Sequence, residues 1–131
     1  MTTLDHKYEF VTWEDVETFI AEVEDYLQDN KITVTGVYGL PRGGLIFAVM
    51  LSHVLDTPLL MAPANNCLIV DDICDSGESL LHYINNSSGD RRNQYITATM
   101  YMKTNQLVCP DFYYKVKTDS WIVFPWEGIY S

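Results

Sequence analysis

Carboxylate and hydroxyl side chains are concentrated in one short segment, residues 70–79. This segment overlaps the end of residues 67–70, a continuous apolar run of the kind expected for a central parallel strand covered on both faces. Core packing does not need so many polar groups, so the segment is a candidate ligand site. Asp71 and Asp72, near its start, suit sugar hydroxyls or a hydrated Mg²⁺, because carboxylate oxygens accept hydrogen bonds from both.

The later half of the same segment suits a phosphate group. Gly77 permits close approach of the backbone to a ligand, and Ser76 and Ser79 offer hydroxyl donors. A helix predicted over residues 79–84 would add the free N–H groups of its first turn. These features together predict a phosphate-binding loop.

A glycine-rich turn, Gly-Leu-Pro-Arg-Gly-Gly at residues 39–44, lies one strand earlier. Arg42 brings to it a positive charge and planar donors that match phosphate oxygens. Alone, such a turn is commonly just the lead-in to a helix. Its pairing with the acidic segment favours a ligand site.

Apolar periodicity predicts strands and helices that alternate through the middle of the chain. Thr12 is a predicted N-cap for an amphipathic helix ending near Leu27. The other predicted elements are strands at residues 32–38, 58–61, 67–70 and 95–102, helices at 45–55 and 79–84, and two short strands within 112–124. This alternation predicts an α/β fold with a mainly parallel sheet flanked by helices. Such sheets bind ligands beyond the carboxyl ends of their strands, where both candidate loops fall.

Length and composition restrict the possible functions. The 131 residues, 47% of them hydrophobic, suit one domain over residues 1–131. A formal net charge of −10 argues against DNA or RNA as a partner. We expect no membrane association, since no apolar stretch approaches the roughly 20 residues of a membrane span. The first ten residues lack a secretory pattern, and Cys67, Cys74 and Cys109 form no close pair, so we expect buried thiols in a cytoplasmic protein.

Residues 67–79 resemble the signature of the type I phosphoribosyltransferases: an apolar strand, two acids, two variable residues, then Asp-Thr/Ser-Gly-x-Thr/Ser. Residues 39–44 are similar to the pyrophosphate loop of that family, and the resemblance extends over residues 34–127. It implies a parallel-sheet fold with a small C-terminal hood. It also implies binding of phosphoribosyl pyrophosphate by Leu40, Pro41, Arg42, Gly43, Asp71, Asp72, Asp75, Ser76, Gly77, Glu78 and Ser79.

The resemblance also implies a role for each part of this donor site. Asp71 and Asp72 would hold the ribose hydroxyls and, through water, Mg²⁺. Residues 76–79 would anchor the 5′-phosphate, and Arg42 would steady the pyrophosphate. Asp75 would act as the catalytic acid–base group that accepts or relays the proton of the base.

The C-terminal part is similar to the purine branch of the family, which acts on hypoxanthine, guanine or xanthine. Lys103 matches the lysine that contacts the exocyclic oxygen of a 6-oxopurine. Trp121 matches the aromatic residue that stacks on the base, and the backbone of Ile122 would read the base edge. The implied reaction transfers ribose 5-phosphate to a 6-oxopurine in purine salvage. The alternative from the residues alone is that Lys103 is a loop lysine and Trp121 a core residue.

One departure from the family keeps an alternative open. Residues 62–66 replace a long mobile loop that usually precedes the acidic strand and closes over the active site. A non-catalytic regulatory protein that binds phosphoribosyl pyrophosphate or a nucleotide on this fold is therefore the alternative. A receiver or flavin-binding domain is a more distant one. The resemblance further implies a cis peptide bond between Pro41 and Arg42, and a homodimer.

Overall fold

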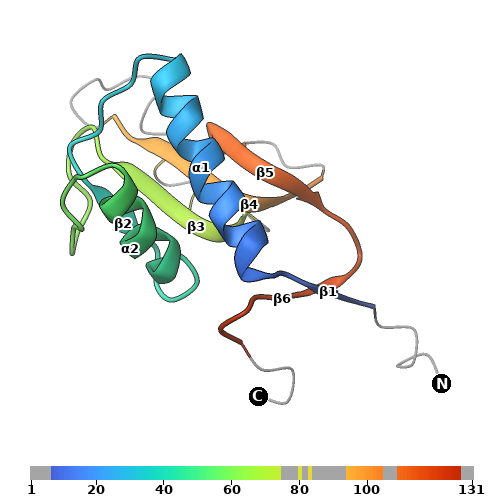
Figure 1. The fold of residues 1–131 in the computed structure, drawn as a ribbon. Helices are drawn as coiled ribbons and strands as arrows, with labels where there is room; N and C mark the ends of the chain where they lie inside the picture. Colours follow the sequence, from blue (N-terminus) through green and yellow to red (C-terminus); the bar gives the residue numbers. More distant parts are fainter. Residues whose placement is uncertain (1–6, 75–79, 81–82, 84–93, 105–108, 128–131) are drawn as a thin grey trace.

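The computed structural model describes residues 7–74, 80, 83, 94–104 and 109–127, which form a main sheet and a second, smaller one (Figure 1). The main sheet has four strands in the order β2-β3-β4-β5. They are β2 (Val37–Gly39), β3 (Leu68–Cys74), β4 (Ile96–Lys103) and β5 (Phe112–Lys117). Each pair of neighbouring strands is parallel. The predicted α/β architecture is thus confirmed.

Helices α1 (Trp13–Asp29) and α2 (Leu45–Val54) cover one face of the main sheet (Figure 1). Thr12 caps α1 as predicted: its hydroxyl accepts from the Asp15 N–H at 3.0 Å, and the Asp15 carboxylate accepts from the Thr12 N–H at 3.0 Å. These two hydrogen bonds satisfy the N–H groups of Thr12 and Asp15, which have no carbonyl partner within the helix. The apolar side chains of α1 at helical spacing are buried: Val16, Phe19, Ile20, Val23 and Leu27. That apolar stripe fixes α1 on the sheet.

Buried side chains form two clusters, one on each face of the main sheet. The cluster beneath α1 and α2 includes Phe19, Phe47, Leu68, Val70 and Met100. The opposite cluster includes Cys67, Ile69, Met102 and Leu80, with Tyr83 packed against it. Leu80 and Tyr83 are helical, so both faces carry helical residues as predicted; the rest of the helix expected at residues 79–84 lies outside the described residues.

The smaller sheet joins the two ends of the chain. Strand β1 (Tyr8–Phe10), which the sequence did not predict, pairs in parallel with β6 (Trp121–Val123), with Tyr8 opposite Trp121. The Trp126 ring stacks on Phe124 at 5.3 Å, and Phe124 is buried in the cluster beneath α1 and α2. We call this two-stranded sheet the hood sheet; it occupies the place of the expected C-terminal hood.

Two predicted strands on the β2 side of the sheet need correction. The strand expected at residues 32–38 is reduced to β2, because the Ile32 N–H donates to the Leu27 carbonyl and the Thr35 N–H to the Asn66 carbonyl. These bonds hold the segment to the end of α1 and to a turn, away from the sheet. The strand expected at residues 58–61 is wrong: it contributes one isolated bridge, between Leu59 and Val37.

Strand β3 is longer than predicted. It continues past Val70 to Cys74, so Asp71 and Asp72 are strand residues. Cys67 and Cys74 are buried as expected, but Cys109 is exposed, because it lies in the connection between β4 and β5 and has no place in either cluster. Neither helix in the described part of the chain has the length and hydropathy that crossing a membrane would require.

Candidate functional site

The two sequence motifs meet at the carboxyl edge of the main sheet. Strands β2 and β3 are neighbours with Gly39 opposite Val70, and the Leu40 N–H donates to the Val70 carbonyl at 3.0 Å. The glycine turn then closes on itself, with the Gly44 N–H donating to the Leu40 carbonyl at 2.8 Å. The predicted cis peptide bond between Pro41 and Arg42 is present. The turn is therefore a defined loop that leads directly into α2.

Gly43 and Asp72 make the direct contact between the motifs. A Cβ atom added to Gly43 would overlap the Asp72 carboxylate, with the Asp72 Oδ1 atom only 2.7 Å away. Only glycine leaves room for the carboxylate against this backbone. Gly44 is restricted too, because a Cβ atom there would overlap the Val70 carbonyl oxygen. The glycines thus allow the acidic strand and the loop to pack without an intervening side chain.

Asp71 and Asp72 place two carboxyl groups side by side at this edge. The Asp71 Oδ1 atom accepts from the Asp72 N–H at 2.8 Å, and the Asp72 Oδ1 atom accepts from the Ile73 N–H at 2.7 Å. Burial is the main cause that raises the pKa of Asp71, to about 8, and repulsion from Asp72 adds to it. A cation at this position would favour the ionised form of the pair.

A divalent cation fits this pair of acids. Carboxylate oxygens are ligands that Mg²⁺ prefers, and Mg²⁺ commonly binds one or two carboxylates and keeps several waters. Within the described residues, no group of three or more His, Cys, Asp or Glu side chains could hold a metal ion. The donor set of Asp71 and Asp72 suits a hydrated ion that also contacts a bound ligand.

The donor-site residues that follow β3 lie outside the described residues. They are Asp75, Ser76, Gly77, Glu78 and Ser79. Strand β3 ends at Cys74, at the same edge as the glycine loop. Of the predicted donor site, the structure places Leu40 buried and Pro41 and Arg42 exposed, in one loop beside Asp72.

The residues expected to bind a base lie at the carboxyl end of β4 and in the hood sheet. Lys103 is exposed as the last residue of β4, where it pairs in register with Lys117 of β5. Trp121 is 65% exposed, so the alternative that it packs in the core is wrong. Ile122 is buried between the hood sheet and the core, with its backbone in the ladder opposite Glu9.

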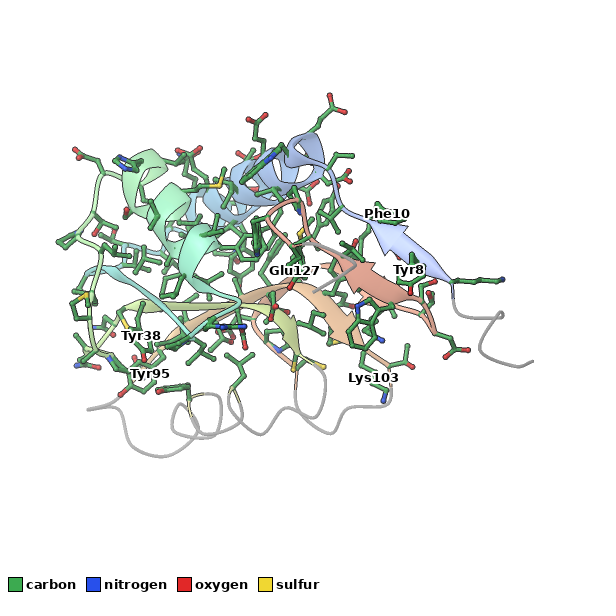
Figure 2. The ribbon with its side chains drawn as sticks, turned by 90° about the horizontal axis from the view of Figure 1, so that it is seen from below. Tyr8, Phe10, Tyr38, Tyr95, Lys103 and Glu127 are labelled. Carbon is green, nitrogen blue, oxygen red and sulfur yellow. The ribbon has the colours of Figure 1, made fainter. Side chains whose placement is uncertain are left out.

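Figure 2 marks the two ends of β4 with Tyr95 and Lys103, and the labelled β1 residues Tyr8 and Phe10 lie at the Lys103 end. A contact fixes this placement: the Tyr101 hydroxyl, two residues before Lys103, donates to the Glu9 carboxylate at 2.7 Å. Burial, and then this bond, raise the pKa of Tyr101. The hood sheet is therefore held beside the carboxyl edge of the main sheet.

Sequence reasoning missed Tyr8, which lies opposite Trp121 in the hood sheet and is half exposed. A weak signal existed, because Tyr8 and Phe10 alternate with Glu9 at the two-residue period of a strand. A pattern of three residues is too short to identify a strand, and it does not indicate which strand would pair with it. The pairing with β6 is visible only in the fold.

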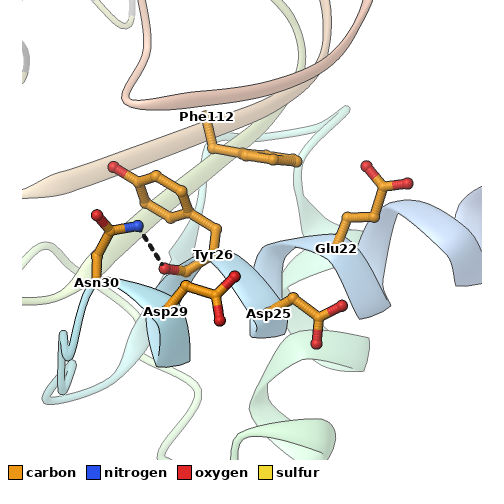
Figure 3. A pocket seen from close by; sticks show the side chains of 6 residues that line it. All are labelled: Glu22, Asp25, Tyr26, Asp29, Asn30 and Phe112. Carbon is orange, nitrogen blue, oxygen red and sulfur yellow. Dashed lines mark hydrogen bonds between the residues drawn. The ribbon is translucent and has the colours of Figure 1, made fainter.

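A shallow pocket elsewhere on the surface does not belong to this site (Figure 3). It is lined by Glu22, Asp25, Tyr26, Asp29, Asn30 and Phe112. Phe112 is the first residue of β5, so the pocket lies at the amino edge of the parallel sheet. The candidate site lies at the opposite, carboxyl edge.

Comparison with known proteins gives matches among solved structures. No protein-family model matches the sequence, and no curated protein matches it. A purine phosphoribosyltransferase from Pyrococcus horikoshii OT3 is similar at 31% identity and a TM-score of 0.76, over 94% of this chain and 95% of that one. A xanthine-guanine-hypoxanthine phosphoribosyltransferase from Helicobacter pylori is 21% identical, with a TM-score of 0.71 over 92% and 93% of the two chains.

A hypothetical protein from Neisseria gonorrhoeae, solved with bound ppGpp, is 16% identical, with a TM-score of 0.72 over 95% of this chain and 91% of that one. At this level of identity, the second and third similarities concern the fold. The similarity to the Pyrococcus protein extends over nearly the whole of both chains. On that similarity, and on the contact between its glycine loop and its acidic strand, the chain belongs to the type I phosphoribosyltransferase family.

Proposed function

We propose that this protein transfers ribose 5-phosphate from phosphoribosyl pyrophosphate to a 6-oxopurine base, releasing a nucleoside monophosphate and pyrophosphate. The observation that carries the proposal is the contact of Asp72 with Gly43. It brings a carboxylate suited to sugar hydroxyls against a loop suited to a diphosphate. Phosphoribosyl pyrophosphate carries both sugar hydroxyls and a diphosphate, so it matches the carboxylate and the loop that lie side by side here.

The loop and the acids have separate tasks on the donor. Arg42 is exposed at the tip of the loop, where its guanidinium can pair with phosphate oxygens in bidentate fashion. Asp71 and Asp72 hold the ribose hydroxyls and, through water, Mg²⁺, which when bound stabilises the pyrophosphate leaving group. Asp75 as acid–base residue and residues 76–79 as the 5′-phosphate loop are proposed from the family motif alone.

The acceptor base is assigned to the space between β4 and the hood sheet. The exposed Trp121 ring offers a stacking surface, and the backbone of Ile122 offers hydrogen bonds to the base edge. Lys103 donates to an oxygen at position 6 of the purine. Lys103 and Lys117 end neighbouring strands, so this edge of an acidic chain carries two positive charges that can attract an anionic donor.

A regulatory protein that binds the same donor or a nucleotide is the second candidate. The observation that favours it is the compact turn at residues 62–66, closed by bonds from the Cys67 N–H to the Ala64 carbonyl and from the Thr35 hydroxyl to the Asn65 carbonyl. This turn is too short to close over a substrate. The similar Neisseria protein was solved with ppGpp, a nucleotide.

One experiment separates the two candidates. The protein is incubated with phosphoribosyl pyrophosphate and Mg²⁺ in four parallel reactions, each with one base: hypoxanthine, guanine, xanthine or adenine. The nucleotide formed in each reaction is measured by chromatography. Donor binding is measured in parallel by calorimetry. Binding with product supports the enzyme, and binding without product supports the regulatory protein. No binding at millimolar donor contradicts the enzyme and leaves only a regulatory protein that binds a nucleotide. The expected homodimer is checked by light scattering.

A further inference from the structure

Thr99, in the middle of β4, carries an unsatisfied polar group beside the proposed donor site. The residue is fully buried, at 0% exposure. Its hydroxyl is the buried side-chain oxygen that makes no hydrogen bond in the described part of the chain. Buried hydroxyls in folded proteins nearly always have a partner, so an exception needs an explanation.

The neighbouring threonine on the same strand shows that the fold can satisfy such a group. Thr97 lies two residues earlier, so its side chain leaves the same face of β4. Its hydroxyl donates to the Asp111 carboxylate at 3.2 Å and accepts from the Asp111 N–H at 3.0 Å. The residue type and the strand face are the same, and only Thr99 lacks a partner.

The strand register gives Thr99 two direct partners with polar side chains, Asp71 in β3 and Tyr113 in β5. Tyr113 is 40% exposed and carries its hydroxyl at the far end of its ring, whereas the carboxyl group of Asp71 lies close to the backbone. Neighbouring strands lie roughly 5 Å apart, and partners in register project their side chains from the same face. Rotation about these two short side chains can therefore change the distance between the hydroxyl and the carboxylate without moving the backbone.

We propose that Thr99 is a positioning residue whose hydroxyl donates to the Asp71 carboxylate when phosphoribosyl pyrophosphate and Mg²⁺ occupy the site. The inference rests on the proposed donor site, although not on catalysis there. The free protein leaves the hydroxyl unpaired, and the occupied site pairs it. Binding energy of the donor therefore includes a hydrogen bond to a charged group, which is stronger than one between neutral groups.

The structural alternative makes a different prediction. If Thr99 only fills space, replacing its hydroxyl by a methyl group of the same shape removes an unsatisfied polar group and changes nothing else. Thr99→Val would then raise the melting temperature and leave the donor affinity as it was. Our proposal also expects a more stable free protein, but with a weaker donor site.

The test is isothermal titration calorimetry with phosphoribosyl pyrophosphate and Mg²⁺, together with thermal melting of the free protein. Thr99→Val should raise the dissociation constant for the donor about tenfold while the free protein melts no lower than wild type. Thr99→Ser, which keeps the hydroxyl, should bind the donor within about twofold of wild type. Thr97→Val is the matched control and should lower the melting temperature without changing donor affinity.

The results distinguish failure of this inference from failure of the proposed site. A wild-type protein that binds no donor contradicts the donor site itself, and Thr99 with it. A wild-type protein that binds the donor, with Thr99→Val binding equally well, overturns only the role of Thr99. Weakened binding in both Thr99→Val and Thr99→Ser would also overturn it, since packing rather than the hydroxyl would then matter.

Discussion

The Tyr101 hydroxyl donates a 2.7 Å hydrogen bond to the carboxylate of Glu9, which ties β4 to β1 across 92 residues of sequence. Tyr101 is buried, and the bond gives its hydroxyl a charged partner. It also holds the hood sheet, which carries Trp121, beside the end of β4. The bond thus links the stability of the fold to the position of the proposed base site.

We therefore expect Tyr101→Phe to weaken base binding more than donor binding. Loss of the hydroxyl leaves the Glu9 carboxylate without this donor and should lower the free energy of unfolding by about 1–3 kcal/mol. The KM for the base should rise, while the dissociation constant for phosphoribosyl pyrophosphate stays near that of wild type. Tyr113→Phe, on an exposed residue of β5, is the control. Equal effects on base and donor would contradict the proposed division of the site.

Gly43→Ala tests the contact between the loop and the acidic strand. The new methyl group would overlap the Asp72 carboxylate, which must then move away from the loop. Loss of a charge-assisted contact to the donor is worth roughly 1.5–3 kcal/mol, so donor affinity should fall by about 10- to 100-fold in calorimetry.

Gly36→Ala is the matched control for this glycine. Its added Cβ atom would meet the flexible Leu60 side chain, at 2.7 Å from Cγ, and not the site. This variant should lower the melting temperature without a change in donor affinity. If Gly43→Ala binds the donor as well as Gly36→Ala does, the loop is not part of the donor site.

The raised pKa of Asp71 predicts how stability depends on pH. The folded protein keeps the Asp71 proton up to a pKa of about 8, whereas the unfolded chain releases it near the ordinary value of 3.8. Between these values the folded state binds more protons, so this residue makes the free energy of unfolding fall as pH rises from about 4 to 8. Asp71→Asn should remove that part of the decline.

Urea denaturation of wild type and Asp71→Asn at pH 5, 7 and 9 measures this effect. The variant should gain stability relative to wild type as pH increases, and the difference should level off above pH 8. Asp29→Asn, at the amino edge of the sheet, controls for the loss of one negative charge from an acidic chain. A constant difference between Asp71→Asn and wild type at all three pH values would show that the Asp71 carboxyl is not buried in this way.

The parts of the site that the sequence predicts are those whose chemistry is local. The glycine loop and the acidic segment each place their polar groups within a few residues, so their residue types alone indicate a ligand. Strand β4 also has a clear apolar pattern. The glycine loop and β4 lie where the sequence predicts them, and β3 extends further than its apolar residues suggest, while residues 75–79 of the acidic segment lie outside the described residues.

Features that depend on distant pairing were not predictable. Strand β1 has three residues, and only its register with β6 and the bond between Glu9 and Tyr101 give it a place. Residues 58–61 have the composition of a strand. In the structure, however, only Leu59 among them forms a bridge, with Val37 of β2, so they do not form a ladder with a neighbouring strand. Thr99 is an ordinary strand residue until its register with Asp71 is known.

Two acid-to-amide variants should separate catalysis from binding. Asp72→Asn removes a charge that contacts the donor loop and should weaken donor binding by roughly 1.5–3 kcal/mol. Asp75→Asn removes the proposed acid–base group and should lower turnover by about 10²–10⁴-fold with little change in donor affinity. Single-turnover kinetics and calorimetry measure both quantities. Near-normal turnover in Asp75→Asn would contradict the role assigned to that residue.

Lys103 should decide which bases are accepted. Its ammonium group donates to an oxygen at position 6 of a purine, whereas the amino group of adenine at that position offers no acceptor in its place. Wild type should therefore use hypoxanthine, guanine or xanthine in preference to adenine. In Lys103→Met, kcat/KM for the 6-oxopurines should fall by about 10- to 100-fold, as expected for loss of a hydrogen bond to a charged donor, and that for adenine should change little.

Lys117→Met is the matched control, because Lys117 is the register partner of Lys103 at the end of β5 and carries the same charge. It removes one positive charge from the same edge of the sheet without removing the proposed contact to the base. Its preference among the four bases should therefore be that of wild type, even if donor binding weakens through the lost charge. If adenine is the best acceptor of the wild-type protein, the assignment of Lys103 to the base is wrong. If Lys117→Met alters base preference as much as Lys103→Met does, Lys103 acts through its charge alone and does not read the base.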